Sequence, residues 1–95
     1  MTILLIEHRV PNFDAWKAAF DSDPVGREEG GVRGYRISRP VDDPNLVFIA
    51  LEFDSSDEAE AFREKLHALW SRIESQGLIE SPQATILEVV ETKEL

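Results

Sequence analysis

The chain has 95 residues, which suits one domain spanning residues 1–95 with a single modest core. Its formal net charge is −9 at pH 7, and an acidic surface repels phosphate backbones and anionic lipid headgroups, so no nucleic-acid or membrane partner is expected. The lack of cysteine excludes disulfides, thiolate metal sites and cysteine nucleophiles. With no cleavage pattern near its start and no apolar run near the ~20 residues of a membrane span, the chain is predicted to be cytoplasmic.

The beginning of the chain predicts a strand followed by a helix. Residues 2–10 distribute apolar side chains over two alternating faces, and Pro11 ends the run. Asn12 is a favourable helix N-cap, and the segment FDAWKAAF (13–20) places its aromatic residues at helical spacing.

Two further strands are predicted after a short helical turn. Asp23-Pro24 is a helix start signal, which predicts a helical turn from Pro24 to Glu29, ended by two glycines. The segments VRGYRISR (32–39) and LVFIALEF (46–53) have the composition of strands. The turn PVDDPN between them joins the pair as a hairpin with a longer loop.

The last part of the chain contains the clearest helical pattern. Ser55 and Glu58 have the spacing of a capping box, and Gly77 stands where a helix C-cap glycine belongs. The final segment, ATILEVVE (84–91), predicts a fourth strand. Between cap and glycine, apolar residues recur every three or four positions: Ala59, Phe62, Leu66, Leu69 and Ile73.

The resulting element order, β-α-β-β-α-β, is that of the ferredoxin-like arrangement in the α+β class. It predicts a four-stranded antiparallel sheet with both helices on one face. The other face then has no cover within the chain. By strict alternation we assign to that open face the apolar residues Ile3, Leu5, Phe48, Ala50, Ile86 and Val90, and the polar residues Glu7, Arg9, Arg36, Ser38, Glu52 and Glu88.

An apolar open sheet face is unusual in a monomer, because such a face normally carries polar side chains. The simplest cover is the same face of a second copy, since two-fold dimers are the commonest oligomers. Two sheets packed in this way form a barrel. The space between the sheets is either a dimer core filled by its own side chains or a pocket for a small molecule.

Two segments of the chain resemble a known superfamily. EHRVPNFDAWKAAFD (7–21) and RGYRISRPVDDPNLVFIALEFDSSDEAEAF (33–62) are similar to the dimeric α+β barrel proteins, in particular to the antibiotic-biosynthesis-monooxygenase-like group and its small bacterial members. The resemblance implies a homodimer in which the open sheet faces of two copies pack together and form a barrel. It also implies, as an expectation, a monooxygenase that acts on aromatic or polyketide-like substrates without a cofactor.

The haem-degrading relatives in that superfamily use an asparagine on the first strand together with a tryptophan and a histidine. Here the first strand offers Glu7 and His8, and the third strand has no tryptophan. His67 lies on the second helix, as the haem-ligating histidine does. These departures argue against haem degradation. The spacing of the two histidines also predicts no metal site.

The first strand supplies the first candidate site residue. His8 is expected to face the helices near Trp16 or Tyr35, either as a core histidine with a hydrogen-bond partner or as a general base. A second candidate is a carboxylate–arginine cluster on the open face, either a dimer-rim ion-pair network or a site in which one acid has a raised pKa. Its members are Glu7, Arg36, Glu52 and Glu88.

Two functions are therefore considered. The first is a homodimeric small-molecule-binding protein that is also an oxygenase, with His8, Glu7 and Arg36 as catalytic residues; Arg36 would stabilise a substrate anion. The second is a non-catalytic dimeric module with a filled interface. A pocket of a few hundred Å³ with convergent polar groups would favour the first. The substrate-binding residues expected for it are Tyr35, Phe48, Glu52, Trp70 and Glu88.

Overall fold

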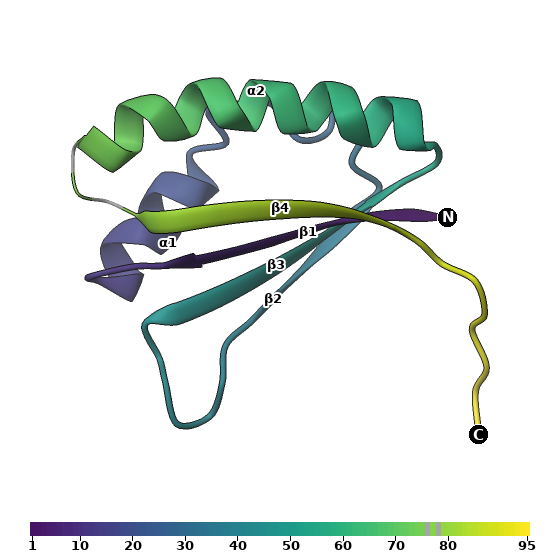
Figure 1. The fold of residues 1–95 in the computed structure, drawn as a ribbon, viewed down its shortest axis with the longest axis horizontal. Helices are drawn as coiled ribbons and strands as arrows, with labels where there is room; N and C mark the ends of the chain where they lie inside the picture. The colour runs from purple at the N-terminus through teal and green to yellow at the C-terminus, as the bar shows by residue number, and fades with distance from the viewer. Residues whose placement is uncertain (76, 78) are drawn as a thin grey trace.

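The computed structural model describes residues 1–75, 77 and 79–95, and it confirms the predicted element order (Figure 1). A four-stranded antiparallel sheet has the strand order β2-β3-β1-β4. The long helix α2 lies along one face of this sheet (Figure 1). No helix in the described part of the chain is long and apolar enough to cross a bilayer. In chain order the elements are β1 (Thr2–Arg9), α1 (Phe13–Asp21), β2 (Gly34–Ser38), β3 (Leu46–Phe53), α2 (Ser56–Ser75) and β4 (Glu80–Glu88).

Strict alternation places one face of β1 and β3 in the core, as the sequence predicts. Leu4 and Ile6 on β1 are buried, and they pair across the ladder with the equally buried Leu51 and Ile49 on β3. Both helices cover this face, because Trp16 of α1 and Phe62 of α2 belong to the same core cluster. At roughly 25 cal/mol per Å² of apolar surface, burial of these side chains is the main stabilising term of the fold.

The predicted faces of the last strand are wrong. Ile86 pairs with Leu4 and packs against the core, whereas Leu87 pairs with Ile3 and is 40% exposed on the open face. Glu88 pairs with the buried Thr2, so it also lies on the helix side rather than in the open-face cluster. Neighbouring residues around Ile86 are apolar at both even and odd positions, so alternation alone does not show which face Ile86 lies on. Pairing with β1 makes that choice.

The bounds of two predicted elements also differ. β4 begins at Glu80 and ends at Glu88, and its pairing with β1 shifts register near Ser81, whose backbone is left-handed at φ 52°. Such a bulge bends the strand and increases its local twist. The expected helical turn after Pro24 is a series of turns rather than a helix, although the amide of Gly30 does donate to the carbonyl of Gly26 at 2.9 Å.

The predicted helix caps are confirmed. Asn12 Oδ1 accepts a hydrogen bond from the backbone N–H of Ala15 at 3.1 Å, which fixes the start of α1. Ser55 Oγ accepts from the backbone N–H of Glu58 at 3.3 Å in front of α2. Gly77 has φ 73°, the left-handed conformation of a C-cap.

The connection between α1 and β2 runs close beneath α2. A Cβ atom placed on Gly30 would lie 2.6 Å from Cδ1 of Phe62, so only glycine allows this approach. Gly31 follows with φ 98°, which turns the chain toward β2. The connection thereby becomes one wall of the space between helices and sheet.

Candidate functional site

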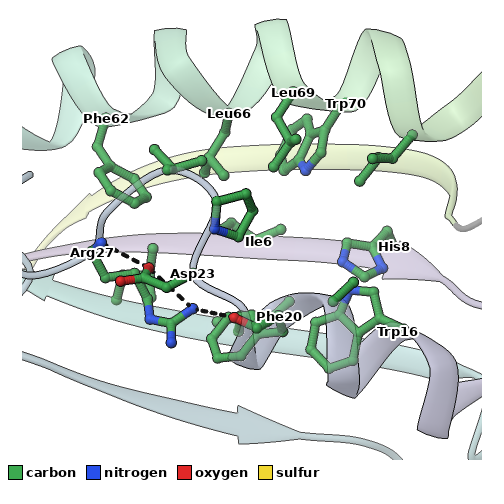
Figure 2. Close-up of a pocket in the computed structure, with 16 residues that line it drawn as sticks. Ile6, His8, Trp16, Phe20, Asp23, Arg27, Phe62, Leu66, Leu69 and Trp70 are labelled. Carbon is green, nitrogen blue, oxygen red and sulfur yellow. Dashed lines mark hydrogen bonds and ion pairs between the residues drawn. The ribbon is translucent and has the colours of Figure 1, made fainter.

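A partly open cavity of about 90 Å³ lies between the helix side of the sheet and the two helices (Figure 2). Its walls are almost entirely apolar, and the residues that line it carry three titratable side chains: His8, Asp23 and Arg27. The cavity is large enough for a few water molecules or a single small ring, and smaller than the ~300 Å³ of a typical drug-sized pocket. The principal apolar wall residues are Ile6, Trp16, Phe20, Ile49, Phe62, Leu66 and Trp70.

His8 projects from β1 into this apolar space. Its side chain is 4% exposed, and its Nδ1 has no hydrogen-bond partner among the described residues. The ring meets Trp16 edge to face, with centroids 5.4 Å apart. Burial lowers the pKa of His8 to about 4, and a hydrogen bond with its own backbone acts in the opposite direction. His8 is therefore neutral at physiological pH, and its Nδ1 is buried with almost no surface open to the cavity.

Asp23 and Arg27 form the polar end of the cavity, away from His8 (Figure 2). Nη1 of Arg27 donates to the backbone carbonyl of Phe20 at 2.7 Å and lies 3.6 Å from Oδ1 of Asp23. The same Oδ1 accepts the backbone N–H of Arg27 at 2.9 Å. Asp23 has φ 54°, a conformation that costs energy for a residue other than glycine.

The guanidinium of Arg27 is also held by two aromatic rings. Its carbon lies 4.0 Å from the ring centroid of Phe20 and 5.1 Å from that of Tyr35. The two rings meet edge to face at 5.2 Å. Stacking of this kind restrains a cation and partly desolvates it. The side chain of Arg27 is 18% exposed.

The sequence prediction for His8 is confirmed in position: it faces the helices beside Trp16. Trp70 lines the same cavity from α2 and is buried. Tyr35 does not line the cavity, but it contacts Phe20 and Arg27 at the cavity's edge. The roles proposed for these side chains stay predictions.

The other predicted site residues lie elsewhere. Glu7 and Phe48 are cross-strand partners on the open face, and Arg36 pairs there with Ala50. The Glu52 side chain lies over Gly34, at 3.1 Å from the place of a Cβ atom on that glycine. No ion pair joins Glu7, Arg36 or Glu52 in the described part of the chain, and Glu88 lies on the opposite face, so the expected cluster does not assemble in one protomer.

The sequence reasoning did not include Arg27. One available signal was the spacing of Asp23 and Arg27, four residues apart, which suits an ion pair within a helical turn. What the sequence did not indicate was that the turn would stand over the cavity. Among residues 1–75, 77 and 79–95, no three acidic or histidine side chains come together to hold a metal ion.

No protein-family model and no curated protein matches the sequence. Solved structures match over nearly the whole chain. A point mutant of MhuD with two manganese protoporphyrin IX molecules bound per active site has a TM-score of 0.73 at 15% identity, covering 99% of both chains. SnoaB, a cofactor-independent oxygenase from Streptomyces nogalater, has a TM-score of 0.71 at 14% identity, covering 96% of this chain and 94% of its own.

A dimeric ferredoxin-like protein from an uncultured marine organism matches over 100% of both chains, with a TM-score of 0.64 at 12% identity. Other matching structures bear the name antibiotic biosynthesis monooxygenase. Similarity at these identities concerns the backbone, so it establishes the architecture and not the chemistry. The chain has the ferredoxin-like fold of the antibiotic-biosynthesis-monooxygenase-like proteins.

Proposed function

We propose that the protein binds a small hydroxylated aromatic molecule, a phenol, in the cavity between helices and sheet, and that it oxygenates this molecule without a cofactor. One observation carries the proposal: His8, a buried imidazole whose Nδ1 has no partner among the described residues, lies at the aromatic-lined end of the cavity. A buried polar atom without a partner costs free energy, roughly 1–3 kcal/mol. A ligand hydroxyl that donates to the imidazole after a small rotation of the ring would recover this cost.

The neutral state of His8 suits this role, because a neutral imidazole keeps one nitrogen that accepts a hydrogen bond. Its low pKa makes it a weak base when the cavity is empty. Transfer of the phenol proton to His8 therefore depends on the phenolate formed beside it, since opposite charges attract strongly in a dry cavity.

The proposed reaction is balanced with dioxygen as the only co-reactant. The electron-rich phenolate reacts with O₂ at a ring carbon that carries hydrogen, and a new C–O bond forms. Cleavage of the O–O bond leaves one oxygen atom as a quinone carbonyl and releases the other as water, with both hydrogens derived from the phenol. SnoaB, which shares the fold, is a cofactor-independent oxygenase. This likeness supports the reaction class and not the substrate.

The cavity volume limits the substrate. About 90 Å³ accommodates one small ring without movement of the walls. A polycyclic substrate, such as the polyketide-like molecules expected from the resemblance, requires displacement of Trp16 or Trp70. A porphyrin is larger still, so the residues that line this cavity do not fit a haem.

We also propose that the working form is a homodimer. The open face presents apolar side chains that no helix or strand in the described part of the chain covers, and Leu87 joins them in place of Ile86. Burial of this face against a second copy removes it from water twice over. The similarity to a dimeric ferredoxin-like protein supports the same arrangement.

The binding proposal can be tested by titration of tryptophan fluorescence, because Trp16 and Trp70 both line the cavity. Phenol should bind more tightly than anisole, which has the same ring but no donor O–H group. His8→Leu should remove this difference, whereas His67→Leu, at an exposed position on α2, should retain it. Equal binding of phenol and anisole by the unaltered protein would contradict the role of His8.

The chemical step is tested separately with ¹⁸O₂ and phenol. Mass spectrometry should find one labelled oxygen in the quinone, at a rate that His8→Leu lowers strongly. Binding without any labelled product would instead favour the second candidate function, a non-catalytic binding module. The small volume of the cavity is the observation that favours that candidate.

A further inference from the structure

Residues 90–95, which we call the trailing segment, run past the end of their own sheet. β4 pairs with β1 as far as Glu88, and the N–H of Val89 then donates to the carbonyl of Met1 at 3.1 Å. Beyond this bond, no described residue forms a hydrogen bond with the trailing segment. The segment turns away from α2 and lies clear of the other helices and strands (Figure 1). Its backbone and side chains are therefore available to another chain.

The composition of the trailing segment suits a strand. Val90 and Thr92 are β-branched residues, which favour extended backbone, and residues 90–95 are as many as a common strand contains. All of their side chains are exposed. Glu91 and Glu94 outweigh Lys93, so the segment has a net negative charge. A matching surface would offer unpaired strand backbone together with positive charge.

The outer edge of β2 offers both features. β2 is an edge strand, so alternate N–H and C=O groups on its outer side have no partner strand in the described part of the chain. Residues 32–39 contain three arginines and no acidic residue, in a chain whose net charge is −9. Arg33 forms an ion pair with Asp54, whereas Arg36, at the middle of β2, has no ion-pair partner among the described residues. This edge therefore attracts an acidic strand.

The two-fold symmetry of the proposed homodimer brings the trailing segment and the β2 edge together. β2 and β4 are opposite edges of the sheet. When the open faces of two copies pack about an axis along the strands, β4 of one copy lies against β2 of the other. Glu88 at the end of β4 pairs with Thr2, and Gly34 at the start of β2 pairs with Glu52, so both lie at the same end of the sheet. The trailing segment thus meets β2 of the second copy, while its own β2 lies at the far edge.

We propose that the trailing segment of each copy pairs as an added strand with the β2 edge of the second copy, with its glutamates close to the arginines of that edge. The inference rests on the homodimer of the proposed function and not on the phenol reaction. Strand addition of this kind gains affinity from main-chain hydrogen bonds and specificity from side chains. It also covers an edge that would otherwise be open to aggregation.

Cross-linking tests which copy the trailing segment contacts. The chain has no cysteine, so Thr92→Cys and Ser38→Cys each introduce a single thiol, one in the segment and one on β2. The two variants, made with different masses and mixed, should form a covalent heterodimer with a short bismaleimide reagent. The control replaces Ser38→Cys by His67→Cys, at an exposed position on α2, and should give no such product.

Charge reversal tests the assignment to the basic edge. Glu91→Lys together with Glu94→Lys should weaken the dimer roughly tenfold or more in analytical ultracentrifugation, because the segment then repels the arginines of β2. The matched control is Lys93→Glu, which changes the charge of the same segment in the opposite direction and should not weaken the dimer. Arg36→Glu should restore part of the affinity of the reversed variant. Thermal unfolding of each variant shows whether the fold is kept.

The outcomes separate the strand pairing from the homodimer. A dimer that gives no link between Thr92→Cys and Ser38→Cys, or that links Thr92→Cys equally well to His67→Cys, overturns the pairing and leaves the homodimer intact. A double Thr92→Cys and Ser38→Cys variant whose link stays within one chain also overturns the pairing. Unchanged affinity after reversal of both glutamates overturns the assignment to the β2 edge. A single chain mass for the unaltered protein overturns both the homodimer and the pairing.

Discussion

The imidazole of His8 and the indole of Trp16 meet edge to face, with ring centroids 5.4 Å apart and planes inclined at 64°. The contact joins β1 to α1 and leaves Nδ1 of the histidine without a hydrogen bond among the described residues. A strand residue and a helix residue thus bring a neutral imidazole to the wall of the cavity.

Protonation of His8 should make stability depend on pH. The pKa is about 4 in the folded protein and near its ordinary 6.5 in the unfolded chain. Above pH 6.5 both states are neutral and stability is complete. As the pH falls from 6.5 toward 4, only the unfolded chain takes up the proton, so the free energy of unfolding should fall by roughly 3 kcal/mol.

Denaturant titrations across this pH window measure the effect. The many carboxylates of the chain also titrate in acid, so the comparison with variants is decisive. In His8→Phe the free energy of unfolding should depend less on pH, because the contribution of this histidine is gone. In His67→Phe the pH dependence should be unchanged. An identical pH dependence in His8→Phe and the unaltered protein would mean that His8 is not buried in its neutral form.

Filling the cavity should abolish ligand binding with little effect on stability. Ile73 of α2 lines the cavity and is partly buried, so Ile73→Phe places a ring in a space of about 90 Å³. The free energy of unfolding should fall by less than the roughly 1–3 kcal/mol that overpacking of a filled core costs, because the added atoms enter empty space. Fluorescence titration with phenol and a denaturant curve measure the two effects. Ile86→Phe, which enlarges a core-packed residue outside this cavity, should still bind phenol.

A charge on the open face should separate the proposed dimer. Phe48 lies on that face opposite Glu7, so Phe48→Glu places a second carboxylate there and opposes burial of both. Light scattering should give twice the chain mass of 10.8 kDa for the unaltered protein and the single mass for the variant. Val41→Glu adds the same charge in the exposed hairpin turn and should remain dimeric. A single chain mass for the unaltered protein at micromolar concentration would exclude the dimer.

Gly30→Ala should loosen the wall that the α1–β2 connection provides. The new Cβ atom would lie 2.6 Å from the ring of Phe62, so the ring or the chain must move, at a cost of about 1–3 kcal/mol. Denaturant unfolding measures this loss. In a Phe62→Leu background the same substitution should cost less, because the ring is gone. Equal costs in both backgrounds would show that the contact with Phe62 is not the cause.

Much of the fold follows from local patterns. Three patterns each predict one structure: the apolar stripe on α2, the caps at Asn12 and Ser55, and the strand β3 with apolar residues on both faces. The structure contains all of them. The exception is β4, where Ile86 and Leu87 offer apolar side chains at both parities. A pattern without alternation carries no information about faces, so partner strands decide.

The candidate site was less predictable, because it is made of contacts between elements distant in sequence. The residues themselves determined that His8 faces the helices, since alternation along β1 is strict. Only the tertiary structure decided that the turn after α1 lies over the sheet and brings Arg27 to the same cavity. A left-handed Asp23 and the close approach of Gly30 to Phe62 set the course of that turn, and such long-range packing has no period that a sequence pattern can display.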